Sequence, residues 1–231
     1  MIRISIIIPA FNEENTIIAL LNKVDKVKVE GVQKEIIVID DASKDNTLNL
    51  LKNNNKLYSK LIEFKKNKGK GAAVKSGLEK ATGDYILFQD ADLEYDPNDY
   101  IKLLEPVIRF NADIVIGSRL SAPQLTRVYY FWHKFGNKFI TFVFNILNNT
   151  TFTDIYSCYL LFKSELIKPE NLVTNGWEQQ AEILSLIVDK GNAFYEVPIN
   201  YYGRTYDEGK KIRAYNAIAV LFTIFKKKFF P

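Results

Sequence analysis

Short apolar runs rich in β-branched residues alternate with helix-like stretches through the first half of the chain. The runs occupy residues 4–8, 35–39, 57–64, 85–88 and 113–116. The helix-like stretches between them cover residues 14–27, 45–53, 71–81 and 97–109. Short, almost wholly apolar strands that alternate with helices are typical of a parallel sheet buried on both faces. The sequence therefore predicts an α/β fold with a mainly parallel central sheet flanked by helices on both faces.

The second half of the chain is less regular. Its predicted elements are, in order, a helix at 127–147, a strand at 154–162, a helix at 177–188 and a strand at 194–199. A polar loop over residues 202–209 then leads to a last helix that begins near residue 212. The chain has no internal repeat and no low-complexity linker, and its 231 residues suffice to bury one sizeable core. We therefore expect one domain over residues 1–211, followed by a basic amphipathic helix or tail over residues 212–231.

Polar residues follow four of the predicted strands. In chain order these segments are Pro9-Ala10-Phe11-Asn12-Glu13, Asp40-Asp41-Ala42-Ser43, Gln89-Asp90-Ala91-Asp92 and Gly117-Ser118-Arg119. The carboxyl ends of parallel strands lie at the same edge of a sheet, and ligands of such sheets bind beyond that edge. The four segments are therefore expected to form one site.

Two carboxylates, Asp90 and Asp92, flank a single small residue after the fourth strand. Carboxylate oxygens are the ligands that Mg²⁺ and Mn²⁺ prefer, and such sites leave further positions for water and substrate phosphates. Glu94 can supply a third carboxylate. The alternative is structural, with Asp92 as a helix cap and Asp90 as a turn residue. The position of the pair at a polar strand end favours a metal.

A glycine-interrupted basic loop, residues 67–73, opens the third predicted helix. Glycine allows the backbone to approach a ligand closely, and lysines such as Lys70 favour an anion together with a helix N-terminus. A solvated turn is the alternative. The loop does not fit the Walker pattern and no Gly-x-Gly-x-x-Gly follows the first strand, so a P-loop nucleotidase and an ordinary dinucleotide fold are both disfavoured.

Six segments, taken in order, resemble the motif set of the family 2 inverting glycosyltransferases. They are IIIPAFNEEN at 6–15, VIDDASKDNT at 38–47, NKGKGAA at 67–73, DADLE at 90–94, GSR at 117–119 and TDIYSC at 153–158. Within that family the chain most resembles the dolichol-phosphate-mannose synthase-like branch, which makes polyprenyl-phosphate sugars. The similarity runs from residue 2 to about residue 213.

The resemblance implies a GT-A type nucleotide-sugar-binding fold, a divalent cation (Mg²⁺ or Mn²⁺) and transfer of one sugar from a UDP- or GDP-sugar. The residues implied to line the nucleoside and its ribose are Pro9, Ala10, Asn12 and Glu13. Asp41 would accept a hydrogen bond from the base, and Lys70 would help to bind the donor. Asp90, Asp92 and Glu94 would hold the metal on the donor diphosphate. The metal would neutralise charge on the leaving nucleoside diphosphate, which makes Asp92 a candidate catalytic residue as well.

In this branch the acceptor is a polyprenyl phosphate of the dolichyl type. Because the phosphate is already ionised, transfer needs no strong general base, and basic side chains must instead hold the anion in line. Arg119 fits one such role. Arg204 and Lys210 fit another, because residues 203–210 resemble the branch's Arg-x5-Lys loop after a Val-Pro-Ile strand. The alternative for all three is a solvated surface charge.

Transfer to a hydroxyl of a lipid-linked or surface glycan is the alternative reaction, and it would need a general base. The candidates are Asp154, Glu178 and Glu182. An exposed helical pair is the structural alternative for the two glutamates, and a cap or turn is the alternative for Asp154. A third interpretation, a nucleotide-sugar-binding module without catalysis, is disfavoured by the intact carboxylates after the fourth strand. His133, the only histidine, is expected to be a packing or interfacial residue, and Cys158, the only cysteine, a small buried hydrophobic residue.

The net charge of +4 is concentrated at one end of the chain. Residues 204–231 hold seven basic and two acidic side chains, which leaves −1 for the other 203 residues. Here an apolar helical stretch precedes Lys226, Lys227 and Lys228, and aromatic residues follow. Lysines near anionic headgroups contribute about 1 kcal/mol each, and aromatic residues favour the membrane interface. We therefore expect peripheral membrane contact through residues 217–231, together with 139–147. A C-terminal helix packed on the core is the alternative.

Composition adds three expectations about the setting of the protein. No apolar stretch approaches the length of about 20 residues that a spanning helix needs. One cysteine and no secretory n-region indicate a cytoplasmic protein, placed here at the cytoplasmic face of a membrane. Nucleic acid is not an expected partner, because acidic strand ends between the basic segments would repel its phosphates.

Overall fold

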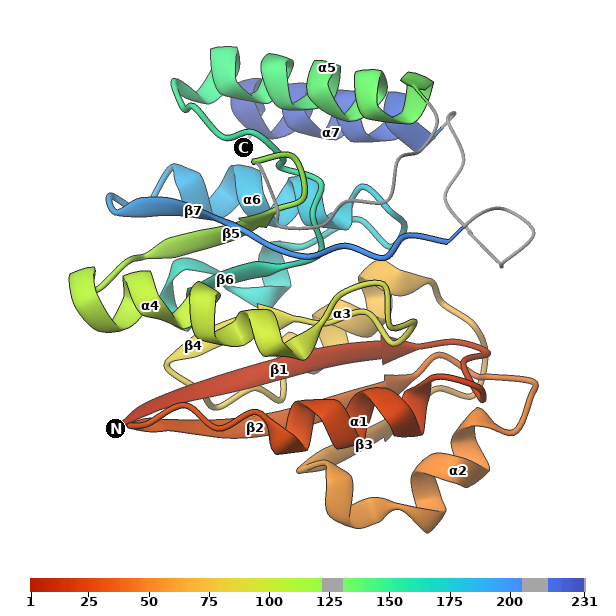
Figure 1. The fold of residues 1–231 in the computed structure, drawn as a ribbon. Coiled ribbons are helices and arrows are strands. Elements are labelled where there is room, and N and C mark those ends of the chain that lie inside the picture. Colours follow the sequence, from red (N-terminus) through yellow and green to blue (C-terminus); the bar gives the residue numbers. More distant parts are fainter. Residues whose placement is uncertain (122–130, 205–215, 231) are drawn as a thin grey trace.

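A seven-stranded sheet forms the centre of the molecule (Figure 1). The computed structural model describes residues 1–121, 131–204 and 216–230. The strands stand in the order β3-β2-β1-β4-β6-β5-β7. Their bounds are Ile2–Ala10 for β1, Val32–Asp40 for β2, Lys60–Glu63 for β3, Tyr85–Phe88 for β4, Ile114–Ser118 for β5, Leu160–Lys163 for β6 and Phe194–Pro198 for β7. β6 runs antiparallel to β4 and β5, and the other neighbours are parallel, which confirms the predicted mainly parallel sheet.

Helices cover both faces of this sheet. They are α1 (Ile17–Lys26), α2 (Thr47–Asn53), α3 (Lys70–Leu78), α4 (Tyr100–Phe110), α5 (Phe131–Asn148), α6 (Gln179–Val188) and α7 (Asn216–Phe229). In Figure 1, α1 and α4 lie in front of the sheet and α3 and α6 lie behind it. Ile4 of β1 lies with Tyr100 of α4 on the first face, whereas Ile7 lies against α3 on the second. Both faces of β1 are thus buried, which explains why its apolar run does not alternate with polar residues.

The predicted strand over residues 154–162 is correct only at its end. Residues 154–159 form a loop, and β6 begins at Leu160. The backbone N–H of Asp154 donates to the carboxylate of Glu196, and that of Cys158 donates to the Tyr95 hydroxyl. These donors are therefore not available to a strand ladder, and side chains fix the path of the loop instead.

The C-terminal helix packs on the rest of the domain. α7 lies against α5 and α6, and its Val220 and Ile224 are fully buried. α5 and α7 run side by side at the top of Figure 1. Of the two alternatives for this segment, packing on the core is therefore observed, and any membrane contact must use the outward side of the helix.

The three lysines of α7 do not share one environment. Lys226 is exposed, but the side chain of Lys227 is only 10% exposed and its Nζ lies 2.8 Å from Glu182 of α6. Lys228 pairs with Asp189 at 3.2 Å. The expectation that all three lysines face a membrane is therefore wrong for Lys227, because that side chain lies on the same side of the helix as Val220 and Ile224.

A buried carboxylate ties the amino ends of three strands together. Glu35 is 2% exposed and accepts hydrogen bonds from Ser5 Oγ at 2.5 Å, Lys60 Nζ at 2.9 Å and Thr82 N at 2.8 Å. Burial opposes ionisation of Glu35, but these donors outweigh it and lower the pKa from 4.5 to about 2. The charged form of Glu35 therefore stabilises the fold.

Replacing Glu35 with Gln is expected to lower the free energy of unfolding by about 2–3 kcal/mol at pH 7, because each tenfold change in an acid constant corresponds to about 1.4 kcal/mol. The pKa is lower in the folded state, so this stabilisation is complete above about pH 5 and is lost as the pH falls towards 2. Urea denaturation at several pH values measures it, with the half-exposed Glu63→Gln as control. A difference between wild type and variant that stays constant down to pH 2.5 would contradict the assignment.

Candidate active site

A cavity of about 350 Å³ opens at the carboxyl ends of the parallel strands. β1 contributes Pro9 and Ala10 to its wall, and the segments after β2, β4 and β5 contribute Asp41, Asp90 and Arg119. The remaining walls come from the loop before α3, the loop before β6, the start of α6 with the residues before it, and the segment after β7. Their residues include Asn67, Gly69, Lys70, Tyr156, Cys158, Gly176, Trp177, Gln179, Gln180, Tyr201 and Arg204. The predicted convergence of the strand ends is thus observed.

Three carboxylates lie along this wall in the turn after β4. Asp90, Asp92 and Glu94 all line the cavity. Within the turn, the Glu94 N–H donates to Asp92 Oδ1 at 3.1 Å, and Leu93 has a φ of +63°, which bulky residues rarely adopt. The backbone of this turn is therefore strained beside the three carboxylates. Strained residues of this kind are often found at functional sites.

Arg204, from the segment after β7, lies between two of these carboxylates. Its Nη2 donates to Asp92 Oδ2 at 2.7 Å, and its Nε donates to Glu94 Oε1 at 3.0 Å. Its Nη1 lies 3.9 Å from Glu13 Oε2. The Tyr201 hydroxyl donates to the other oxygen of Glu94 at 2.6 Å. One guanidinium therefore supplies positive charge to three acidic side chains.

The acidic cluster perturbs the pKa of its members. Burial, followed by the charges of Asp90 and Glu94, raises the pKa of Asp92 to about 7, although Arg204 opposes the rise. Burial disfavours the charged form of Arg204, but Asp92 and Glu94 more than offset this and raise the Arg204 pKa. The acidic cluster therefore makes this wall of the cavity favourable for positively charged groups.

Lys70 provides a second positive charge, paired with the third carboxylate of the cluster. Its Nζ donates to Asp90 Oδ1 at 2.5 Å and lies 5.4 Å from the centre of the Trp177 ring. Burial opposes the charge on Lys70, but Asp90 outweighs it and the Lys70 pKa is raised. Across the described part of the chain, no three His, Cys, Asp or Glu side chains converge as metal ligands do. Lys70 and Arg204 are the cations paired with the predicted metal ligands.

Asp41 shapes the glycine-interrupted loop. Its carboxylate accepts hydrogen bonds from the backbone N–H groups of Lys68 at 2.7 Å and Gly69 at 2.9 Å. Gly69 has a φ of +93°, which favours glycine, and a Cβ there would lie 2.6 Å from the Asn175 carbonyl oxygen. Each carboxylate oxygen of Asp41 can accept a further hydrogen bond. The predicted role of Asp41 towards a base is therefore compatible with its structural role.

The residues at the end of β1 and just after it divide into two groups. Pro9, Ala10 and Glu13 line the cavity. Asn12 is exposed and does not belong to the lining. Its Oδ1 accepts the N–H of Lys44 at 2.8 Å and its own N–H donates to Ser43 Oγ at 3.0 Å. Asn12 therefore joins two loops, and the neighbouring Phe11 lines the cavity in its place.

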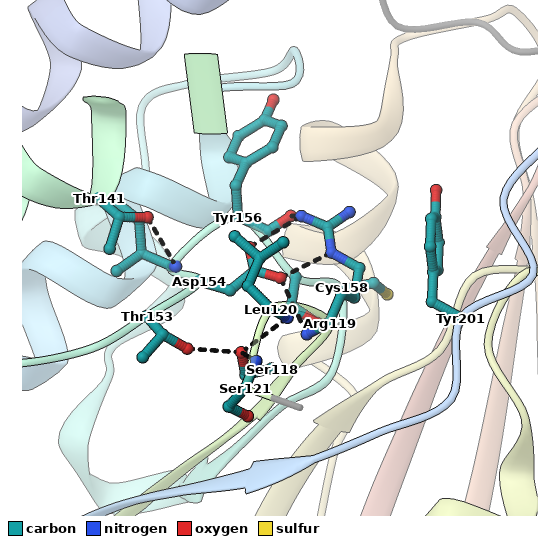
Figure 2. A network of polar contacts seen from close by, with 12 residues as sticks. Ser118, Arg119, Leu120, Ser121, Thr141, Thr153, Asp154, Tyr156, Cys158 and Tyr201 are labelled. Carbon is teal, nitrogen blue, oxygen red and sulfur yellow. Dashed lines mark hydrogen bonds and ion pairs between the residues drawn. The ribbon is translucent and has the colours of Figure 1, made fainter. Parts of the chain in front are cut away.

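Arg119 is held by a buried carboxylate. Its Nε and Nη2 donate to the two oxygens of Asp154 at 2.7 and 2.8 Å, and Nη2 also donates to the Tyr156 carbonyl oxygen. Figure 2 shows Arg119 directed towards Asp154 and Tyr156, with Tyr201 on its other side. The Tyr201 ring lies 5.1 Å from the guanidinium carbon. The side chain of Asp154 is 0% exposed, and Asp154 is absent from the cavity lining. Its carboxylate is therefore paired with Arg119 and does not line the cavity.

The other predicted residues fall at or outside the borders of the site. Glu182 is fully buried and bound to Lys227 and to the loop before α6, so the interpretation as an exposed helical residue is wrong for it. Glu178 does not line the cavity, and its Oε1 accepts the Gly176 N–H at 3.3 Å. Cys158 is buried, as predicted, but lines the cavity. Lys210 and the side chain of His133 lie outside the described residues.

Several lining residues were not predicted, notably Phe11, Tyr156, Gln179 and Tyr201. A signal for Tyr201 was present, because β7, which precedes it, runs parallel to β5 and its carboxyl end must reach the same edge of the sheet. No such signal marked Gln179, which is 3% exposed at the first turn of α6. Its orientation depends on packing between distant segments.

Comparison with known proteins assigns the chain to a family. The model of "Glycosyl transferase family 2" matches residues 5–168. A dolichol-phosphate mannosyltransferase of Pyrococcus furiosus is 31% identical over 211 residues, 90% of this chain and 59% of that protein. A UDP-N-acetylglucosamine–dolichyl-phosphate N-acetylglucosaminyltransferase of Methanococcus voltae is 32% identical over 217 residues, 85% of this chain and 84% of that protein. The chain therefore spans less than two thirds of the Pyrococcus protein.

A solved structure shares the fold. Glucosyl-3-phosphoglycerate synthase of Mycobacterium tuberculosis, crystallised with Mn²⁺, UDP and phosphoglyceric acid, matches all of this chain and 80% of its own with a TM-score of 0.74 at 19% identity. The predicted GT-A type fold is thereby confirmed. Both sequence relatives are named for dolichol phosphate, which confirms the resemblance to the dolichol-phosphate-mannose synthase-like branch. Fold, strand-end motifs and the match over residues 5–168 agree that the chain belongs to glycosyl transferase family 2.

Proposed function

We propose that this chain is a metal-dependent inverting glycosyltransferase that moves a sugar from a UDP- or GDP-sugar to a polyprenyl phosphate of the dolichyl type. One observation carries the proposal: a single cavity combines the three carboxylates after β4 with three basic side chains, Lys70, Arg119 and Arg204. Acidic and basic groups so arranged suit a substrate pair in which a cation-bound diphosphate meets a second phosphate.

The donor would lie along the carboxyl ends of β1, β2 and β4. Pro9 and Ala10 offer an apolar backbone surface for the nucleoside, and Asp41 offers an acceptor for the base. Lys70 stands at the N-terminus of α3, which also favours the negative charge of a diphosphate. Both nucleotides remain compatible with this arrangement, because uracil and guanine each present N–H donors.

The carboxylates after β4 fit a divalent cation by their chemistry. Asp90, Asp92 and Glu94 offer hard oxygen ligands on one wall of the cavity, and Mg²⁺ is commonly bound by one or two carboxylates plus substrate phosphates. When bound, Mg²⁺ or Mn²⁺ would neutralise negative charge on the diphosphate leaving group. Lys70 and Arg204 would then exchange carboxylate partners for phosphate oxygens.

The acceptor phosphate would lie between Arg119 and Arg204. A phosphate oxygen attacks the anomeric carbon, the bond from that carbon to the diphosphate breaks, and the electron pair leaves with the nucleoside diphosphate. Attack from the opposite side inverts the anomeric centre. Asp154, Glu178 and Glu182, the bases considered for a hydroxyl acceptor, all stand outside the cavity lining, which supports an acceptor that is already ionised. Asp154 would act by positioning Arg119.

A panel of UDP- and GDP-sugars tests this function. Each donor is offered with Mn²⁺ or Mg²⁺ and either a short polyprenyl phosphate or the corresponding polyprenol, and release of the nucleoside diphosphate is measured. Turnover is expected with the phosphate only. Turnover with the alcohol or with a glycan hydroxyl would replace the acceptor, and no turnover with any donor would refute the proposal.

An apolar surface on α5 and α7 supports peripheral attachment to a membrane, proposed at its cytoplasmic face. Large apolar side chains are exposed along both helices: Phe131, Trp132, Phe135, Phe139, Phe142 and Ile146 on α5, and Ile218, Phe222, Phe225 and Phe229 on α7. No helix in the described part of the chain is long and apolar enough to cross a bilayer. Exposed aromatic residues on adjacent helices suit the interface of a membrane that carries the acceptor.

Replacing Trp132 and Phe222 together with Ser is expected to lower binding to anionic liposomes at least about fivefold, because two large side chains that are 74% and 68% exposed would no longer enter the interface. Co-sedimentation measures it. The matched control replaces Ile101 and Ile108 of α4 with Ser. These two isoleucines are 56% and 51% exposed. Equal binding by the two double variants would exclude this surface as the membrane contact.

A further inference from the structure

We infer that the ion pair between Lys227 of α7 and Glu182 of α6 positions the donor site, by fixing the loop over residues 171–177 against the glycine-interrupted loop at 67–71. Lys227 is then a positioning residue for the donor nucleotide, although it lies in the C-terminal helix. The inference rests on the proposed function, because it requires a nucleoside diphosphate in the cavity.

The ion pair is buried. Lys227 Nζ lies 2.8 Å from Glu182 Oε1, and the two side chains are 10% and 0% exposed. Lys227 Nζ also donates to the Asn171 carbonyl oxygen at 3.3 Å. A solvated pair would contribute little to the structure, but a buried charge that loses its partner is strongly unfavourable. The pair therefore fixes the distance between α7, α6 and the start of the loop.

Glu182 holds the middle of the same loop. It accepts hydrogen bonds from the Val173 N–H at 3.1 Å, the Thr174 N–H at 2.9 Å and Thr174 Oγ1 at 2.5 Å. Burial disfavours its charge, but Lys227 and Thr174 outweigh this and hold the pKa of Glu182 below its usual value. The charged carboxylate of Glu182 thus joins Lys227, Val173 and Thr174 at a position that solvent does not reach.

The loop over residues 171–177 also contacts the N-terminal half of α3, next to the proposed donor site. The Gly71 N–H donates to the Asn175 carbonyl oxygen at 2.8 Å, and Lys75 Nζ donates to the Leu172 carbonyl oxygen at 2.8 Å. A Cβ on Gly71 would lie 2.7 Å from the Asn175 backbone, so the two loops are in direct contact. Any movement of the loop at Asn175 is therefore transmitted to the N-terminus of α3.

The loop ends in the cavity wall. Gly176 and Trp177 both line the cavity, and the Trp177 ring faces Lys70 Nζ at 5.4 Å. The path from Lys227 to the cavity thus runs through the ion pair with Glu182, the hydrogen bond from Thr174 to Glu182 and the backbone to Asn175. From Asn175 it continues through the hydrogen bond to Gly71 and along the backbone to Trp177. Lys226, which is exposed, and Lys228, which pairs with Asp189, belong to the same helix and have no part in this path.

The experiment compares K227M with K226M and K228M as matched controls and with K227R as the conservative variant. Isothermal titration of UDP and GDP with Mn²⁺ gives nucleotide affinity, and steady-state kinetics give KM for donor and acceptor. In a W132F background, Trp177 is the only tryptophan, so its emission reports on the loop without any ligand. Far-UV circular dichroism shows which variants are folded.

We expect K227M to weaken nucleotide binding and raise the donor KM about tenfold, to leave the acceptor KM unchanged and to shift Trp177 emission, while K226M and K228M resemble wild type. K227R should restore most of the affinity. If K227M does not fold, E182Q, which keeps an acceptor oxygen for the loop, is expected to show the same split to a smaller extent. Unchanged Trp177 emission and donor KM in folded K227M or E182Q would overturn the inference. Failure of wild type to bind either nucleotide would instead refute the proposed function.

Discussion

Replacing Asp92 with Asn is expected to lower turnover by about 100- to 1,000-fold, because loss of this carboxylate weakens a cation site expected to stabilise the leaving-group charge by several kcal/mol. The side chain keeps its size and its Oδ1 can still accept the Glu94 N–H, so the fold is expected to persist. Initial rates of nucleotide release at saturating Mn²⁺ and donor measure the effect.

Asp96 provides the matched control for this variant. It lies four residues further on, outside the cavity lining, and its carboxylate accepts the Asn98 N–H. Asn is an equally good cap at such a position, so Asp96→Asn should keep wild-type turnover. An Asp92→Asn enzyme that retains more than a tenth of the wild-type rate would remove Asp92 from the catalytic residues.

Two opposite effects are expected from Arg204→Ala. Without nucleotide, Mn²⁺ should bind about tenfold more tightly, because the guanidinium no longer occupies the carboxylates of Asp92 and Glu94. Transfer to a polyprenyl phosphate should nevertheless fall by about 100-fold or more, because one of the groups that hold the acceptor anion is lost. Titration of Mn²⁺ into the protein measures the first effect, and rates at saturating donor measure the second.

Removal of any positive charge near the site would favour Mn²⁺ to some degree, and Lys68→Ala corrects for this. Lys68 stands beside the cavity with its ammonium group over the Phe64 ring at 4.4 Å. Its replacement should change Mn²⁺ affinity much less than Arg204→Ala does. Equal changes in the two variants would mean that the contacts of Arg204 with the carboxylates do not compete with the cation.

The convergence of the site could be predicted from the sequence because it depends on strand direction alone. Asp41, Asp90 and Arg119 follow different strands, and parallel strands bring their carboxyl ends to one edge whatever the packing details. The partners of these residues could not be predicted in this way. That Arg119 binds Asp154, or that Arg204 reaches Asp92 and Glu94, depends on the paths of irregular loops, which no periodicity describes.

The C-terminal helix shows how a signal can be overlooked. Three consecutive lysines suggested contact with a membrane, yet Lys227 follows Val220 and Ile224 at positions i+7 and i+3, so it shares their helical face. Both apolar residues are buried, and Lys227 is carried inward with them. The burial of Glu182 was not visible in the same way, because α6 is apolar on most of its circumference and offers no polar face for comparison.

The position of β6 bears on the order in which the molecule assembles. β5 reaches β4 only through β6, whose residues follow β5 by more than forty positions, so the sheet is completed out of chain order. Strands β1 to β4, which include those that precede Asp41 and Asp90, can pair with one another early in synthesis. Strands β5 and β7, which precede Arg119 and Arg204, join them only once Leu160–Lys163 has emerged. Long-range pairing of this kind is slow. We therefore expect the half of the cavity proposed for the nucleotide to form before the half proposed for the lipid phosphate, with β6 as the strand that joins the two.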